Sequence, residues 1–217
     1  TGKAKCKEEL QKKMGLEVNP DIPVIGIVTR LVDQKGIAEI FAPTYGSIYQ
    51  ICTDMKVQFA ILGSGESWCE NEICALQSKL PNLRAYIGYD DALSHLIEAG
   101  SDFFLMPSKY EPCGLNQIYS MLYGTLPIVR KTGGLADTVD NYNQQTGEGT
   151  GFVFEQLTPR AIYDTVGWAV WAYYNKKDHI KKMQQAGMKK TFGWDEAAEK
   201  YVQVYKEALE RGCGIRK

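Results

Sequence analysis

The sequence predicts an α/β fold built on an open, doubly wound parallel sheet. Short apolar runs recur along the 217 residues, and each is bounded by Gly, Pro, Asn or Asp, as strands are. The runs are apolar nearly throughout and do not alternate with polar residues, which is typical of strands buried on both faces. Segments with helical periodicity lie between them. This alternation of strand and helix predicts a Rossmann-like domain with helices on both faces of its sheet.

The predicted elements follow one another along the chain. Strands are expected at residues 23–28, 57–62, 84–87, 102–107, 126–130 and 151–154. Helices are expected between them, at residues 36–54, 68–79, 91–98 and 115–123. The last of these helices has the clearest pattern, because its apolar residues recur at i, i+3, i+4 and i+7 and Gly124 follows as a stop. The opening stretch TGKAKCKEELQKKMGL is expected to form an amphipathic helix.

The C-terminal part of the chain has a different pattern. Apolar residues at helical spacing from Ile162 to Tyr173 predict one helix, and DEAAEKYVQVYKEALE predicts another after Trp194. Such a pair of helices could pack back on the sheet or reach another domain. The pattern alone leaves both arrangements open.

The composition argues against several classes of partner. The formal net charge is −1, so there is no basic surplus to draw in nucleic acid or an anionic membrane. No apolar run approaches the roughly 20 residues of a membrane span. The six cysteines lack metal-binding spacing and are expected to be reduced thiols in a cytosol-like compartment. The sequence has no Asp-x-Asp pair to hold a divalent metal on a diphosphate, so no metal site is predicted.

The stretch YEPCGLNQ, residues 110–117, joins a predicted strand to a predicted helix. In an open parallel sheet, ligands bind at the carboxyl ends of the strands, and a helix that begins there points free N–H groups at them. Gly114, Leu115 and Asn116 can therefore offer amides to a phosphate. Glu111 is expected as an exposed carboxylate at the edge of the crevice, where it could accept hydrogen bonds from sugar hydroxyls. The alternative for Glu111 is an ordinary loop residue.

Two further strand ends carry candidate residues. Arg30 and Lys35 flank the loop after the first strand, and two cations at one strand end suit a diphosphate whose charge grows as it leaves. They could also be solvated loop residues. Gly133 and Gly134 follow a later strand and suit close approach of the backbone to a ligand, or simply a tight turn.

For two further residues, Tyr89 and His95, the sequence does not decide between a binding role and a structural role. Tyr89, at the end of the third predicted strand, could stack on a base or could serve in packing. His95 lies one turn into a predicted helix beside Leu93 and Leu96, and it is expected to be a structural histidine. With two histidines in the chain and no serine or cysteine pattern around them, a nucleophilic triad has little support.

The assembled motifs resemble those of the bacterial glycogen synthase and plant starch synthase family. The segments TRLVDQKG, IGYDDALSHLI, SKYEPCGLNQIYSMLYGTLPIVRKTGGLADTV, GTGFVFE and FGWDEAAEKYVQVYKEAL occur in this order, from about residue 3 to residue 209. The family consists of retaining glucosyltransferases that use ADP-glucose to elongate α-1,4-glucan. Two departures are visible. Asn116 stands where Thr is usual, and Tyr119 stands where related families carry a second Glu.

The resemblance implies a role for each candidate residue. Arg30 and Lys35 would hold the donor diphosphate, and Tyr89 would pack against the adenine. Glu111 would contact the donor sugar and be required for transfer. The amides of the 114–116 stretch would meet the distal phosphate. No cofactor or metal is expected beside the substrate ADP-glucose.

The resemblance also implies a domain organisation. Family members have two Rossmann-like domains in a GT-B arrangement, and residues 1–217 resemble the C-terminal, nucleotide-sugar-binding half as one domain. A helix at 191–210 would cross back to the N-terminal domain that binds the glucan acceptor. Without that domain, the 217 residues are expected to be inactive. The compartment would be the cytoplasm in a bacterium or the plastid stroma in a plant or alga.

Three questions stay open at this point. The donor could be a UDP-sugar used by a related retaining transferase of the same fold. The chain could also be a nucleotide-sugar-binding module without catalysis. Whether the polymer is starch or glycogen does not follow from the motifs.

Overall fold

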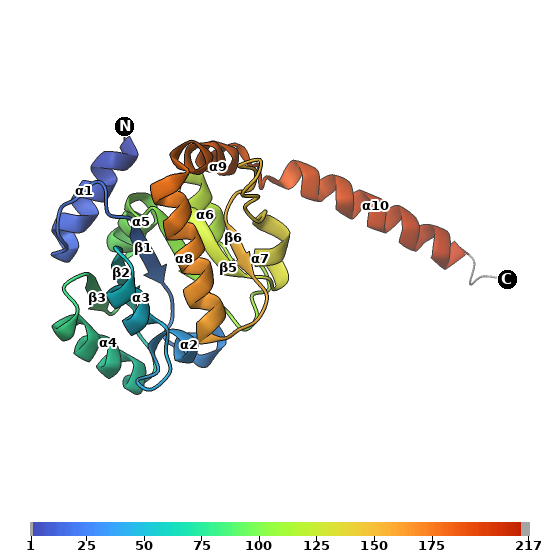
Figure 1. Ribbon diagram of the computed structural model, residues 1–217. Coiled ribbons are helices and arrows are strands. Elements are labelled where there is room, and N and C mark those ends of the chain that lie inside the picture. The colour runs from blue at the N-terminus through green and yellow to red at the C-terminus, as the bar shows by residue number, and fades with distance from the viewer. Residues whose placement is uncertain (1, 214–217) are drawn as a thin grey trace.

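The protein is described over residues 2–213 by a computed structural model, in which one six-stranded parallel sheet lies between two layers of helices (Figure 1). The strand order is β3-β2-β1-β4-β5-β6, and every neighbouring pair is parallel. The six predicted strands are confirmed, as β1 (Val24–Val28), β2 (Gln58–Gly63), β3 (Leu83–Ile87), β4 (Phe103–Met106), β5 (Leu126–Arg130) and β6 (Phe152–Phe154). This order is that of a doubly wound sheet, whose direction of winding reverses between β1 and β4.

Ten α-helices and one 3-10 turn connect and cover the strands in residues 2–213. They are α1 (Gly2–Met14), η1 (Asp33–Lys35), α2 (Ile37–Phe41), α3 (Ile48–Asp54), α4 (Ser67–Lys79), α5 (Asp91–Gly100), α6 (Asn116–Leu122), α7 (Gly133–Thr138), α8 (Pro159–Asn175), α9 (Lys177–Lys189) and α10 (Trp194–Cys213). Helix α10 begins close to the expected residue 191 and extends away from the rest of the molecule (Figure 1).

The single helix predicted at residues 36–54 is wrong, because the structure has two short helices there, α2 and α3. The break contains Pro43, which disfavours the helical conformation in the residue before it. Ala42 accordingly has φ −56° and ψ 131°, outside the helical region. Apolar periodicity continues on both sides of the break, which is why the pattern alone suggested one element.

Alternate residues of the strands face two separate cores. On one face Ile25, Phe59 and Phe103 pack with residues of α2, α3, α4 and α8. On the other face Val24 and Phe104 pack with residues of α1 and α5. Both faces of the central strands are therefore apolar, as the unbroken apolar runs predicted.

Helix α1 is held by buried polar groups in addition to the apolar contacts of Leu10. Lys3 Nζ donates to the carbonyl oxygens of Ala99 (2.9 Å) and Ser101 (2.6 Å), and burial lowers the pKa of Lys3 to about 8. Lys7 Nζ lies 2.8 Å from Asp102 Oδ2, with both side chains nearly inaccessible. The same carboxylate oxygen accepts the N–H of Val24, the first residue of β1, at 2.8 Å. The expected amphipathic helix is thus anchored by ions as well as by an apolar face.

Replacing Lys7 with alanine is expected to lower the free energy of unfolding by about 3 kcal/mol, because Asp102 would stay buried without its cation. The matched control is Lys12→Ala on the same helix. Lys12 pairs with Glu8 where both side chains are half exposed, so its loss should leave stability nearly unchanged. Urea denaturation followed by circular dichroism measures both. Equal stability of the two variants would contradict a stabilising role for the buried pair.

Candidate functional site

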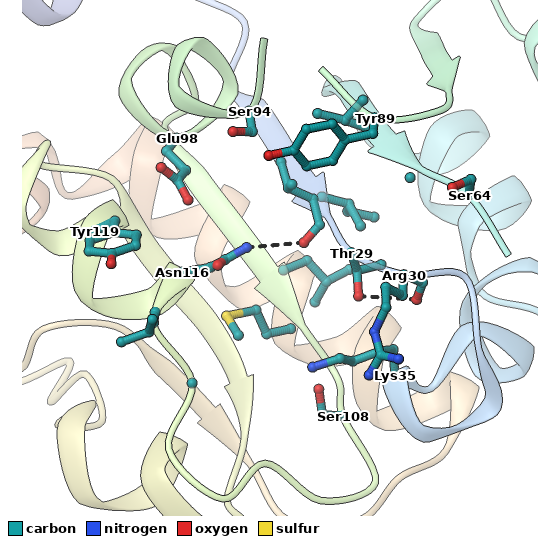
Figure 2. A pocket seen from close by; sticks show the side chains of 18 of the residues that line it. Thr29, Arg30, Lys35, Ser64, Tyr89, Ser94, Glu98, Ser108, Asn116 and Tyr119 are labelled. Atoms are coloured by element: carbon teal, nitrogen blue, oxygen red, sulfur yellow. Dashed lines mark hydrogen bonds between the residues drawn. The ribbon is translucent and has the colours of Figure 1, made fainter. Parts of the chain in front are cut away.

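A cavity of about 440 Å³ lies at the carboxyl ends of β1, β2 and β4 (Figure 2). This is the point at which the winding of the sheet reverses, where open α/β sheets bind their ligands. Helices α5 and α6 form two of its walls, and the loops after β1 and β4 complete it. Seven of the nine residues predicted for the site line it, namely Arg30, Lys35, Tyr89, Glu111, Gly114, Leu115 and Asn116.

One end of the cavity is cationic. Lys35 Nζ lies 2.5 Å from Glu111 Oε2, and Ser108 Oγ donates to the same oxygen at 3.2 Å. Arg30 is exposed, and within residues 2–213 its guanidinium makes no hydrogen bond or ion pair. Arg30 and the surface of Lys35 can therefore meet an anionic group that enters from solvent.

The Lys35–Glu111 contact depends on a glycine. Gly36 follows Lys35 with φ +70°, and a Cβ built on it would lie 2.2 Å from the carbonyl oxygen of Pro107, at the end of β4. A side chain at this position is therefore excluded both by conformation and by space. The glycine lets the turn after β1 sit against the turn after β4, which brings Lys35 to the carboxylate.

The expectation that Glu111 is exposed is wrong. Its exposure is 9%, because the loop that carries it is covered by the start of α7. The N–H of Gly134 donates to the carbonyl oxygen of Glu111 at 3.0 Å. The carboxylate still lines the cavity, so Glu111 is a buried, paired acid within it and not a solvated acid at its edge.

Gly133 and Gly134 approach the protein's own backbone. A Cβ on Gly133 would lie 2.1 Å from the Glu111 oxygen, and one on Gly134 would lie 2.0 Å from the Cys113 oxygen. Neither residue is among those that line the cavity in the described part of the chain. These two glycines allow α7 to pack on the loop, while direct contact with a ligand stays a prediction.

The loop before α6 presents unused amides. No hydrogen bond within residues 2–213 is made by the N–H groups of Gly114, Leu115 or Asn116, all of which line the cavity. The loop is held from behind by Gln117, whose amide donates to the carbonyl oxygens of Cys113 (3.0 Å) and Gly114 (3.1 Å). Successive free N–H groups in a fixed loop are suited to bind phosphate oxygens.

Asn116 also contributes its side chain. Its Nδ2 donates to the carbonyl oxygen of Val28, the last residue of β1, at 3.1 Å (Figure 2). This bond ties the first residue of α6 to the strand that ends in the Arg30 loop. The unusual residue at this position therefore has a structural function that the sequence did not indicate.

Tyr89 stands at the mouth of the cavity. Its exposure is 84%, and it follows Gly88, whose φ of +147° turns the chain out of β3. An aromatic side chain this exposed contributes little to packing, so the structural alternative for Tyr89 is disfavoured. It offers a free face for a flat ligand group.

Helix α5 adds a polar stripe that sequence reasoning missed. Asp91, Ser94, His95 and Glu98 recur at i, i+3, i+4 and i+7, and all four line the cavity. His95, expected to be structural, pairs with Asp91 and Glu98 of its own helix, but 55% of its side chain is exposed, so it is not a core residue. The spacing of these four residues is a helical face, and that signal was available in the sequence.

Glu98 is the unusual member of this stripe. Its exposure is 3%, and within residues 2–213 its Oε2 has no hydrogen-bond partner, although His95 Nδ1 lies 3.3 Å away. Burial raises the pKa of Glu98, and His95 opposes that shift. A carboxylate in this state is available to a donor group on a ligand.

Residues 2–213 contain neither a metal-binding cluster nor a membrane-spanning helix. No group of three or more His, Cys, Asp or Glu side chains is arranged to hold a metal ion. No helix there is both long and apolar enough to cross a membrane. Cys6, Cys52, Cys69, Cys74 and Cys113 are free thiols, as expected.

Comparisons with known proteins agree with the fold and the motifs. The family model for glycosyl transferases group 1 matches residues 8–187. Glycogen synthase of Treponema denticola is 66% identical over 213 residues, which are 98% of this chain and 43% of that protein. Glycogen synthase 1 of Geobacter metallireducens is 46% identical over 99% of this chain and 42% of its own length. The chain thus spans less than half the length of these relatives.

A solved structure gives the same result. The catalytic domain of Starch Synthase IV from Arabidopsis thaliana, bound to ADP and acarbose, superposes with a TM-score of 0.84 and is 32% identical. The match covers 97% of this chain and 43% of that one. The predicted fold and the resemblance to glycogen and starch synthases are confirmed. The chain belongs to the glycosyl transferases of group 1.

Proposed function

We propose that this chain is the donor-binding part of a retaining ADP-glucose:α-1,4-glucan glucosyltransferase. The observation that carries the proposal is a single cavity that combines a cationic end, unused loop amides and an exposed aromatic ring. A nucleoside diphosphate sugar needs these three features, for its phosphates and its base. The similarity to glycogen synthases supports glucose as the sugar and α-glucan as the acceptor.

In this proposal Lys35 and Arg30 bind the diphosphate. The departing ADP gains negative charge as the glucosyl bond breaks, so fixed cations stabilise the transition state more than the bound substrate. The free N–H groups of residues 114–116 add to this stabilisation without any rearrangement. Because Lys35 is already paired with Glu111, the donor would enter a site whose cation is held in place.

Glu111 is the proposed contact for the transferred glucose. Its carboxylate is fixed by Lys35 and Ser108, which leaves its remaining acceptor positions for sugar hydroxyls. Tyr119 occupies the position of the second acid of related families and lines the same cavity. We therefore assign one acid, and not two, to the reacting sugar.

The acceptor glucan would be bound by a second domain, and the 217 residues alone would not elongate it. Helix α10 carries an exposed apolar stripe, with Tyr201, Val204, Tyr205 and Leu209, that suits docking on such a domain. The curated relatives named above are bacterial, so a bacterial cytoplasm is the compartment that we propose.

The 217-residue chain is expected to bind ADP and ADP-glucose without a divalent metal, because Arg30, Lys35 and the loop amides supply the positive potential. Titration calorimetry in EDTA and in magnesium should give the same affinity. UDP should bind more weakly than ADP in both. Binding that is lost in EDTA and restored by magnesium would overturn this account, and equal affinity for UDP would favour a UDP-sugar donor.

Tyr89→Ala is expected to weaken ADP binding by about 1–2 kcal/mol, the scale of one base–aromatic stack. The matched control is Tyr45→Ala, which removes another exposed tyrosine, 59% accessible, outside the cavity. Calorimetry with ADP and with inorganic pyrophosphate separates the base from the phosphates. A loss of the same size for pyrophosphate would show that Tyr89 does not act through the base.

Glu111→Gln is expected to lower glucosyl transfer by about 100-fold, on the scale of one positioned transition-state contact. The assay requires this chain joined to the acceptor-binding part that the longer relatives contain. Stability should also fall, because the buried partner of Lys35 loses its charge, so urea denaturation is measured in parallel. Ser108→Ala, which retains the ion pair, is the control for altered positioning of the carboxylate. Near-normal transfer by a folded Glu111→Gln variant would remove Glu111 from the reaction.

A further inference from the structure

Glu98 is a buried acid that lies 3.3 Å from the half-exposed His95 and, within residues 2–213, forms no hydrogen bond with it. Its exposure is 3%, and its Oε2 makes no hydrogen bond in the part of the chain that the structure describes. Burying a polar group without a partner destabilises the folded state, and burying a charge does so more strongly. Buried polar atoms left unpaired in this way are uncommon in native proteins and call for an explanation. A ligand that supplies the missing donors is one.

The position of Glu98 limits what that ligand group can be. Glu98 lies on the wall of the cavity formed by α5, and Asn116 and Tyr119 lie on the wall formed by α6. Figure 2 shows Glu98 and Tyr119 on the opposite side of the cavity from Arg30 and Lys35. A carboxylate repels phosphate oxygens, so the phosphates belong at the cationic end. The groups near Glu98 must instead be neutral hydrogen-bond donors.

A nucleoside offers such donors, in the hydroxyls of its ribose and in the amino group of adenine. Tyr89 lies two residues before α5, so a base stacked on it would bring the nucleoside to the side of the cavity where α5 presents its polar stripe. Ser94, one turn before Glu98 on this stripe, lines the cavity as well. The polar residues of α5 could therefore contact both the base and the ribose of a bound nucleoside.

We propose that Glu98 is a specificity-determining residue of the donor cavity, whose carboxylate accepts hydrogen bonds from the O–H or N–H donors of the nucleoside. The inference rests on the proposed binding of a nucleoside diphosphate and identifies a residue that recognises it. It also accounts for the missing partner, because the ligand satisfies Glu98 only when bound. The neutral donors of ribose and of adenine share this chemistry, and the experiment separates them.

The proposal predicts opposite effects on stability and on binding. Glu98→Gln and Glu98→Met retain the length of the side chain and remove the buried charge. Both should leave the melting temperature unchanged or raised, because the penalty for burying the charge is removed and the lost contact with the half-exposed His95 contributes little. Both should weaken ADP binding by about tenfold, the scale of a hydrogen bond to a charged group. Glu72→Gln is the matched control, since it removes an acid of α4 that does not line the cavity.

Titration calorimetry with ADP, 2′-deoxy-ADP, 3′-deoxy-ADP and inosine diphosphate identifies the donor group. If Glu98 accepts from a ribose hydroxyl, the parent and the variants should bind the corresponding deoxy analogue equally. If it accepts from the adenine amino group, they should bind inosine diphosphate equally. Either result supports the proposal and identifies the group of the nucleotide that donates the hydrogen bond to Glu98.

Other outcomes overturn it. Variants that bind ADP as tightly as the parent would remove Glu98 from recognition and leave the proposed donor site intact. An equal loss for all four nucleotides would show an indirect effect and also contradict the proposal. A parent chain that binds none of them would overturn the donor site as well. Thermal denaturation of each variant separates these results from unfolding.

Discussion

The contact between Lys35 and Glu111 is the interaction on which the candidate site depends. It joins the turn after β1 to the turn after β4, two strands that lie side by side at the point where the winding of the sheet reverses. The two turns could not come so close with a side chain at Gly36, where a Cβ would lie 2.2 Å from the carbonyl oxygen of Pro107. Helix α7 could not pack on the Glu111 loop with side chains at Gly133 and Gly134, where a Cβ would meet backbone oxygens at 2.0–2.1 Å. The glycines around this contact thus fix a cation and an acid in one place before any ligand arrives, which is the preorganisation that electrostatic catalysis requires.

The sequence was a good guide wherever one local pattern determined the structure. The strands were found because both faces of the sheet are covered, so each strand is apolar throughout. The junction at residues 110–117 was found because a strand end, a glycine and a helix start occur together. The helix at 36–54 was misjudged because the apolar pattern outweighed Pro43. The apolar periodicity favoured one continuous helix, whereas the proline disfavours helical conformation in the residue before it, and the chain forms two helices.

Long-range packing was beyond the reach of that reasoning. The burial of Glu111 is caused by α7, whose glycines lie more than twenty residues later in the chain. The side chain of Asn116 bonds to Val28, 88 positions away. Neither contact has a local signal. The α5 stripe is a different case, because its spacing is plainly helical and a polar face opposite Leu93 and Ile97 could have been noticed. It was overlooked because polar residues on a helix usually face solvent, whereas these line a cavity.

The two buried acids of the cavity illustrate how charge is divided within it. Glu111 is paired with Lys35, so its negative charge is already compensated and the cation is held at the end of the cavity proposed for the diphosphate. Glu98 is compensated less, because its ionic neighbour His95 is half exposed and, within residues 2–213, its Oε2 forms no hydrogen bond. A ligand with negative phosphates and a neutral nucleoside would complement this division, since its anionic part avoids Glu98 and its donors satisfy it. The same cavity would disfavour a ligand bound in the reverse direction, because that would bring phosphate to the buried carboxylate of Glu98. If the proposed donor binds here, the arrangement of charge would favour one orientation of it in the cavity.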